Sequence, residues 1–221
     1  MSKFPDKYNL TRRESVFLAK KTLVANIYNS AKLEGVNITF PETKVIVDGT
    51  TISGMDLDDL QIILNLRNAW KYILNNISVE ETLDLACKIN SFVSYNESLE
   101  WGDIRKGSVG ITGVNYKPDV PVRSDVENYI SELMNSDESI TFKAIRYMLY
   151  GMRSQLFWDG NKRTSTLFAN KLLIKHGKGL ISVPEELLPE FHKRLSAFYE
   201  TNDYGEIDTF IYEKCLYGID Y

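Results

Sequence analysis

Nine residues in the second half of the chain read Gln155-Leu156-Phe157-Trp158-Asp159-Gly160-Asn161-Lys162-Arg163. They lie between two apolar segments with helical spacing, Ile140–Ser154 and residues 164–174. Gly160 can adopt a positive φ without steric cost, and Asn161 tolerates the same conformation. A turn of this kind that opens into a helix presents backbone N–H groups to an anion. The stretch therefore predicts an anion-binding turn between two helices.

Two cations follow the turn at a place where the helix dipole disfavours them. Lys162 and Arg163 would stand at a helix N-terminus, so their presence indicates that an anion pairs with them. Arg163 can bind phosphate oxygens with two N–H donors, while Lys162 would act as a point charge. Asp159 offers a hard oxygen to a Mg²⁺ ion held mainly by phosphates and water. The alternative is an ordinary solvated turn, because Asp-Gly-Asn is common turn chemistry.

The nine residues resemble the signature loop of the Fic (Fido) family, H-x-F-x-[DE]-G-N-[GK]-R. Every motif position matches except the first, where this chain has Gln155. The resemblance implies a nucleotide site next to the turn. It implies catalytic positions at Gln155, Asp159, Asn161 and Arg163, nucleotide binding by Gly160, Asn161, Lys162 and Arg163, and metal binding by Asp159.

The family's chemistry depends on the missing histidine, which is understood to deprotonate a target hydroxyl that attacks the α-phosphate of ATP. The resemblance therefore implies a protein adenylyltransferase that uses ATP and Mg²⁺ to modify a Ser, Thr or Tyr hydroxyl of a protein. Gln155 cannot take up a proton at neutral pH, and a general base contributes roughly 10²–10⁴-fold. We therefore expect weakened or altered transfer. His176 and His192, the two histidines of the chain, lie in segments that make neither a substitute base.

Other functions stay open beside this one. A catalytically inactive module that binds ATP for regulation is favoured by Gln155. A phosphotransferase is a further alternative, because Lys in place of Gly at position 162 also occurs in family branches that transfer a phosphate. A purely structural helical domain is the last alternative.

A second motif lies near the N-terminus and reads Ser30-Ala31-Lys32-Leu33-Glu34-Gly35. Gly35 is typical of the residue after a helix, which places Glu34 in the last turn, where a negative charge opposes the dipole. The segment resembles the family's inhibitory motif, [ST]-x-x-x-E-[GN], whose glutamate obstructs the γ-phosphate. The resemblance implies inhibitory positions at Ser30, Glu34 and Gly35.

The usual partner of that glutamate is absent, because Thr166 stands where many members have a second arginine. Any obstruction by Glu34 would have to be held by Lys162, Arg163 or Asn161.

Between the two motifs, alternating Val109 and Ile111 with flanking glycines predict a short β-hairpin before a loop punctuated by prolines. Similar segments in the family form a flap that aligns the target by β-strand addition. The resemblance implies target binding by Val109, Gly110, Ile111 and Thr112. A surface hairpin without a partner is the alternative.

Helical patterns and capping residues predict a mainly α fold, a Fic-like helical bundle with a short β-hairpin flap. Capping boxes at Thr11–Glu14, Ser78–Glu81 and Ser124–Glu127 predict helices that run to about residues 35, 93 and 134. Further helices are predicted at 187–199 and 207–216, and residues 36–51 read as a strand or an extended loop. We expect an N-terminal helical extension, 1–60, that carries the inhibitory-like motif, and a Fic-like core, 61–221, within one compact unit.

Composition limits the remaining choices. The chain has 221 residues and a net charge of −4, which gives a nucleic-acid partner no electrostatic support. No apolar run reaches the ~20 residues of a membrane span, and no signal peptide is expected. Cys87 and Cys215 are predicted to be buried free thiols, and Trp70 a core residue. We expect a cytoplasmic protein with no membrane or nucleic-acid partner; a homo-oligomer is left open.

Overall fold

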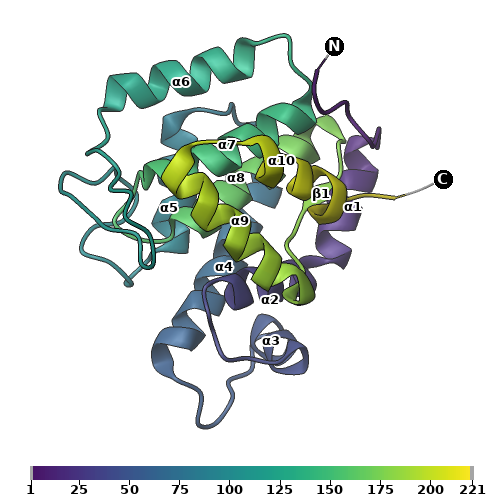
Figure 1. The fold of residues 1–221 in the computed structure, drawn as a ribbon. Helices are drawn as coiled ribbons and strands as arrows, with labels where there is room; N and C mark the ends of the chain where they lie inside the picture. The colour runs from purple at the N-terminus through teal and green to yellow at the C-terminus, as the bar shows by residue number, and fades with distance from the viewer. Residues whose placement is uncertain (1, 220–221) are drawn as a thin grey trace.

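The chain folds around α8, Asn161–His176, in which nearly every residue up to Ile174 is buried. A helix buried on all sides occupies the interior of a domain. In the computed structural model, which describes residues 2–219, α7 (Ile140–Ser154) packs along α8 more extensively than any other element (Figure 1). Tyr147 of α7 stacks on Phe168 of α8 with ring centroids 3.7 Å apart. The two helices that the motif loop joins therefore form the centre of the fold.

The other elements surround this pair. The chain before it forms α1 (Arg12–Lys21), α2 (Leu23–Leu33), α3 (Phe40–Val47), α4 (Leu57–Asn75), α5 (Leu83–Val93) and α6 (Arg123–Asn135). The chain after it forms β1 (Leu180–Ile181), a 3-10 turn (Glu185–Leu187), α9 (Leu188–Thr201), α10 (Gly205–Phe210), a π-helical turn (Ile211–Cys215) and β2 (Leu216–Tyr217). β1 pairs antiparallel with β2. About 60% of the structure is helical, which confirms the mainly α fold.

The N-terminal helices pack on the centre either directly or through α4, which itself contacts α8. α1 contacts α8, and α2 contacts both α3 and α4. One hydrophobic core holds buried residues from both sides of residue 60, among them Ile27 of α2, Ile63 of α4 and Phe168 of α8. In Figure 1, α3 and α6 lie at opposite ends of the molecule. The division at residue 60 stays a prediction.

The single helix predicted from residue 11 to about residue 35 is two helices. Its start is confirmed: Thr11 Oγ1 accepts from the backbone N–H of Glu14 at 3.3 Å, and the Glu14 carboxylate accepts from the N–H of Thr11 at 2.7 Å. The break occurs at Thr22, whose hydroxyl donates to the carbonyl of Leu18 at 2.9 Å. A threonine that bonds back to the preceding turn favours a bend.

The segment 36–51 contains α3, so the prediction of a strand or extended loop is wrong. Thr39 caps the helix, since its hydroxyl accepts from the N–H of Glu42 at 3.4 Å and the Glu42 carboxylate accepts from the N–H of Thr39 at 2.8 Å. Pro41 stands in the first turn, where a helix tolerates the missing N–H. The capping box outweighs the β-branched composition, and Ile46 is buried in the core.

The capping box predicted at Ser78 is also wrong. α5 begins four residues later, after Thr82, whose hydroxyl accepts from a backbone N–H in the first turn. Glu81 does not fold back on Ser78; its carboxylate pairs with Lys171 at 2.6 Å and with Lys175 at 2.8 Å, both on α8. A tertiary ion pair therefore takes the side chain that the local cap needed.

α6 forms where it was predicted, but without the predicted cap. Its N-cap is Val122, and no side chain caps the first turn; the hydroxyl of Ser124 contacts the carboxylate of Asp125 instead. At the C-terminus, α9 confirms the helix predicted at 187–199. The helix predicted at 207–216 is α10, the π-helical turn and the first residue of β2.

The hairpin predicted around Val109 is an irregular loop. Within residues 2–219, Val109, Gly110, Ile111 and Thr112 take part in no β-ladder, and a turn joins the N–H of Val114 to the carbonyl of Ile111 at 3.4 Å. The paired strands β1 and β2 lie in the C-terminal part of the chain. The glycines around this short alternating run leave too few side chains to stabilise an isolated ladder.

Two smaller predictions are confirmed. Cys87 and Cys215 are buried free thiols, and Trp70 is 1% exposed in the core. Across residues 2–219, no helix combines the length and the apolar character that a membrane crossing requires.

Candidate functional site

The motif loop is held in shape by its own asparagine. Asn161 Oδ1 accepts from the N–H of Phe157 at 2.9 Å, and its Nδ2 donates to the carbonyl of Phe157 at 2.9 Å and to Gln155 Oε1 at 3.1 Å. Phe157 and Leu156 are buried and anchor the loop in the core. Asn161 is itself buried, so in this structure its amide braces the loop.

Gly160 is required both for conformation and for space. Its φ is +70°, and a Cβ there would stand 2.3 Å from Ser94 Oγ and 2.7 Å from a methyl group of Val93. Just before it, the carbonyl of Asp159 accepts from Ser94 Oγ at 2.9 Å and from Asn90 Nδ2 at 3.0 Å. The C-terminal end of α5 therefore packs against the loop without a gap.

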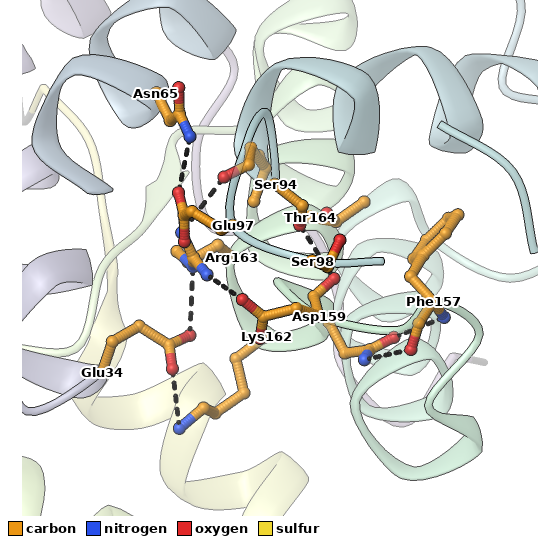
Figure 2. Close-up of polar contacts among 12 residues, drawn as sticks. Glu34, Asn65, Ser94, Glu97, Ser98, Phe157, Asp159, Lys162, Arg163 and Thr164 are labelled. Carbon is orange, nitrogen blue, oxygen red and sulfur yellow. Dashed lines mark hydrogen bonds and ion pairs between the residues drawn. The ribbon is translucent and has the colours of Figure 1, made fainter. Parts of the chain in front are cut away.

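Arg163 is the centre of a buried charge cluster, shown in Figure 2. Its Nη1 lies 2.8 Å from a Glu97 oxygen and donates to the carbonyl of Val93 at 3.1 Å. Its Nη2 pairs with Asp159 at 3.1 Å, and its Nε faces Glu34 at 3.5 Å. Burial lowers the pKa of Arg163, but the three carboxylates outweigh burial and raise it. The guanidinium is therefore charged and surrounded by anions.

Glu34 reaches this cluster from the end of α2. Its Oε2 pairs with Lys162 Nζ at 3.2 Å, and Lys162 also donates to the carbonyl of Leu33 at 3.3 Å. Gly35 follows with a φ of +85°, as its predicted position after the helix requires. Ser30 lies one turn earlier on α2 and is half-buried. Of the partners that the sequence left open for Glu34, Lys162 and Arg163 lie beside it.

Sequence reasoning missed the residues that orient Arg163 from the other side. Glu97 follows α5, and its carboxylate accepts from Asn65 of α4 as well as from Arg163. Burial raises the pKa of Glu97, against the opposing effect of Arg163. Asn65 is 1% exposed and also donates to the carbonyl of Tyr95 at 2.8 Å. No local pattern marks Glu97, because it approaches Arg163 only through the packing of α5 on α8.

The position of the missing histidine is occupied by a constrained glutamine. Gln155 ends α7 in the left-handed region, with a φ of +47°. Its side-chain Nε2 donates to the carbonyl of Met152 at 2.6 Å, while its Oε1 accepts from Asn161. Left-handed backbone is uncommon for a residue other than glycine, asparagine or aspartate. Both polar atoms of the amide are therefore bonded, one to the last turn of α7 and one to the motif loop.

The two histidines stay outside this loop. His176 lies at the far end of α8, and His192 lies on α9. Burial, and then the charge of Lys162, lower the pKa of His192, whereas Glu34 raises it. His192 therefore stands at the edge of the charge cluster, nearer than its position in the sequence suggested.

Comparisons with known proteins agree with this geometry. Residues 80–173, which contain α5 to most of α8, match the model of the Fic/DOC family. Over 202 residues the chain is 25% identical to the protein adenylyltransferase Fic of Drosophila melanogaster, covering 87% of this chain and 40% of that protein. The protein adenylyltransferase Fic of Aedes aegypti is 24% identical over 204 residues, covering 87% and 39%. The chain thus spans about two fifths of the length of these relatives.

Solved structures share the fold. A fragment of Fic-1 from C. elegans superposes with a TM-score of 0.71 at 19% identity, covering 88% of this chain and 59% of that one. A signalling protein from Bacteroides thetaiotaomicron that contains a Fic domain gives a TM-score of 0.69 at 21% identity, covering 84% and 75%. The resemblance noted from the signature loop is confirmed: residues 80–173 match the Fic/DOC family model, and the chain shares its fold with solved structures of Fic-domain proteins.

Proposed function

We propose that this protein is a Fic-type adenylyltransferase of reduced activity that transfers AMP from Mg·ATP to a Ser, Thr or Tyr hydroxyl of a protein. The relatives named protein adenylyltransferase Fic support the reaction class. The motif loop and the cations at the start of α8 support a polyphosphate ligand. The protein target is bound at the loop that contains Val109, Gly110, Ile111 and Thr112.

One observation carries the nucleotide assignment. Arg163 Nε and Glu34 Oε1 are both buried, and neither has a hydrogen-bond partner within residues 2–219. They face each other at 3.5 Å, so Glu34 neutralises the charge of Arg163 without satisfying this N–H. A buried donor without a partner costs about 1–3 kcal/mol. A phosphate oxygen that displaced Glu34 would supply the missing acceptor.

Each polar residue of the motif loop has a separate role in the proposed transfer of AMP. The target hydroxyl loses its proton and forms a bond to the α-phosphorus, while the bond from that phosphorus to the pyrophosphate leaving group breaks. Lys162 and Arg163 stabilise the charge on the phosphates. Gln155 cannot accept the proton, so the proton passes to solvent or to a phosphate oxygen. The Gln155 amide at most orients the hydroxyl. Positioning alone accounts for much of phosphoryl-type catalysis, which leaves slow transfer feasible.

The residues present fit a magnesium ion that is carried in with the nucleotide. The Asp159 side chain is 47% exposed and commits one oxygen to Arg163, so it can supply another to Mg²⁺. Within residues 2–219, no group of three or more metal-ligating side chains forms a site independent of a nucleotide. Bound Mg²⁺ would neutralise phosphate charge.

A non-catalytic ATP-binding module is the second candidate, and the geometry of Gln155 favours it. Both polar atoms of its amide already have partners, one in α7 and one in the loop, so orienting a hydroxyl would require breaking one of these bonds. In this candidate, displacement of Glu34 by ATP shifts α2 and reports nucleotide occupancy. A phosphotransferase remains the third candidate because of Lys162.

The candidates separate in one labelling experiment. The wild type, Glu34→Gly and Glu34→Gly/Gln155→His are incubated with Mg²⁺ and ATP labelled at the α- or at the γ-phosphate, and labelled protein is measured. Adenylyl transfer predicts α-label on Glu34→Gly and a rate roughly 10²–10⁴-fold higher with Gln155→His. Label from the γ-phosphate alone would indicate phosphotransfer.

Two further measurements test the assignment of the site and the binding-module candidate. Asp159→Ala and Arg163→Ala, each in the Glu34→Gly background, should abolish transfer, and transfer that survives both would refute the site. ATP binding by calorimetry without label on Glu34→Gly, but with label after Gln155→His, would establish the binding module.

A further inference from the structure

Arg105 carries a buried charge that forms no ion pair with any carboxylate of residues 2–219. The residue is 0% exposed, and within residues 2–219 none of the ion pairs involves it. Burial lowers the pKa of its guanidinium, and Tyr116 and Asp119 only partly oppose this effect. Burying a charge without a counter-ion is costly unless its donors are satisfied. A side chain retained at such a cost points to a specific role.

The donors of Arg105 are satisfied by main-chain carbonyls alone. On one side, Nε donates to the carbonyl of Gln155, and Nη2 lies 3.4 Å from the carbonyl of Ser154. On the other side, Nη1 donates to the carbonyl of Gly107, and Nη2 donates to the carbonyl of Asp119 at 2.6 Å. One guanidinium therefore joins the start of the motif loop to two points that lie far apart in the intervening segment.

Those two points are the ends of an irregular loop, residues 107–119, here called the 107–119 loop. Its start packs on the motif loop, because a Cβ on Gly107 would stand 2.6 Å from the indole of Trp158. Farther along, Tyr116 lies against the guanidinium of Arg153 at 3.7 Å. Compact surface loops with adjacent ends are frequently functional, and here Arg105 binds both ends of the loop.

The same residue holds the strained backbone at the start of the motif loop. Gln155 has a φ of +47°, and Arg105 binds its carbonyl through Nε. The backbone N–H of Arg105 donates to the next carbonyl, that of Leu156, at 2.9 Å. A strained residue persists only where its surroundings determine its conformation.

We propose that Arg105 is a positioning residue that holds the 107–119 loop and Gln155 as one unit, so that a segment bound by this loop meets the nucleotide in a fixed geometry. The part of this proposal that concerns alignment of target and nucleotide rests on the proposed function. The part that concerns coupling of the 107–119 loop to Gln155 does not depend on it. The planar fork of arginine is essential, because a lysine ammonium has three donors at one point and cannot reach carbonyls on both sides.

The test compares Arg105→Lys and Arg105→Gln with a matched control, Arg123→Lys. Arg123 lies on α6 and pairs with carboxylates on the surface, so its replacement leaves the loops untouched. Amide hydrogen exchange is measured by mass spectrometry for peptides that cover residues 107–119 and 154–158. Both peptides should exchange roughly tenfold faster in the Arg105 variants only, as expected for the loss of about one net hydrogen bond.

Further readouts separate positioning from a purely structural role. Exchange in α8 and the midpoint of thermal unfolding should stay close to the control, and ATP affinity by calorimetry should change less than about threefold. Uniformly faster exchange, or failure of both Arg105 variants to fold, would make Arg105 an ordinary core residue and overturn the proposal. Acceleration of only one of the two peptides would overturn the coupling.

The rate of label transfer tests the role of Arg105 in alignment independently of hydrogen exchange. In the Glu34→Gly background, Arg105→Lys should lower the initial rate of α-label transfer at saturating ATP at least tenfold, while Arg123→Lys does not. If no variant transfers label, the proposed function fails, yet the exchange result still decides whether Arg105 couples the two loops. Unchanged transfer with accelerated exchange would refute the role of Arg105 in alignment.

Discussion

Glu34 and Arg163 face each other at 3.5 Å across the start of α8, and among residues 2–219 the two buried facing atoms have no hydrogen-bond partner. Glu97 holds the opposite end of the same guanidinium at 2.8 Å. The two carboxylates therefore differ in how they bind Arg163. Glu97 is hydrogen-bonded to the guanidinium, whereas Glu34 is held to it by charge alone. Glu34 also forms one ion pair, with Lys162 at 3.2 Å. A ligand anion would displace Glu34 more readily than Glu97.

Removal of the Glu34 carboxylate should strengthen binding of the longer polyphosphate. We expect Glu34→Gly to tighten Mg·ATP by about tenfold, or about 1.4 kcal/mol, and Mg·ADP by less, because the family resemblance places this carboxylate at the γ-phosphate. Isothermal titration calorimetry measures both. Glu100→Gln, which neutralises a half-exposed carboxylate outside the cluster, serves as control. Equal tightening for ATP and ADP would make Glu34 only a helix-end residue.

Loss of Glu97 should destabilise the fold. Glu97→Ala leaves Arg163, with a side chain 2% exposed, without its strongest partner, and breaking a buried pair costs about 3–5 kcal/mol. Urea unfolding followed by circular dichroism gives the free energy. Glu100→Ala, three residues along the same segment, should change it by less than about 0.5 kcal/mol. Similar values for the two variants would contradict the role assigned to Glu97.

Two glycines with similar backbones should respond differently to alanine. Gly160 and Gly113 have φ values of +70° and +82°, but a Cβ would clash only at Gly160, since nothing lies within 4 Å at Gly113. Backbone strain of about 1 kcal/mol is common to both. Gly160→Ala should cost clearly more because Ser94 must move, and the difference in unfolding free energy measures that packing. Equal losses of unfolding free energy in the two variants would mean that Ser94 and the end of α5 can move aside at little cost.

The buried thiols should resist modification and make stability depend on high pH. Burial raises the pKa of Cys87 from 9.0 to about 11 and that of Cys215 from 9.0 to about 12. Since the thiolate is the reactive form, the native protein should react slowly with a thiol reagent at neutral pH and expose both thiols only in urea. Rapid reaction of either thiol in the native protein would place it at the surface.

The sign of the pH effect follows from the direction of these shifts. A pKa raised on folding means that the stabilising contribution is complete below the unfolded value of 9.0 and is lost as the pH rises toward 11 and above. The free energy of unfolding should therefore fall above pH 9. Cys87→Ala/Cys215→Ala should lose less stability over this range than the wild type, and an equal loss would exclude the thiols as its source.

Local patterns determined much of the helical framework. Apolar spacing placed α7 with its observed bounds, and the box at Thr11 and Glu14 placed the start of α1, because caps and periodicity depend only on neighbouring residues. The signature loop likewise indicated the resemblance to the Fic family. The same kind of signal is present for α3, where Thr39 and Glu42 form a capping box in a segment of β-branched composition.

Where a side chain had both a local and a distant partner, the sequence could not decide between them. Glu81 was expected to complete a cap at Ser78, but two lysines of α8 bind it instead, and α5 starts later. The alternating run at Val109 has β propensity, yet it forms no ladder, and its ends are held by Arg105. Contacts between residues far apart in the chain outweigh local preference in both cases.

The sequence by itself determined that this chain has a Fic loop with glutamine in place of histidine and a glutamate at the end of an upstream helix. Only the tertiary structure decided that Glu34 meets Lys162 and Arg163, that Glu97 holds the far end of that arginine, and that Arg105 joins two loops. The reason is physical. A motif records which groups are available, whereas burial and packing of separate helices decide which charges share one site and which donors find partners.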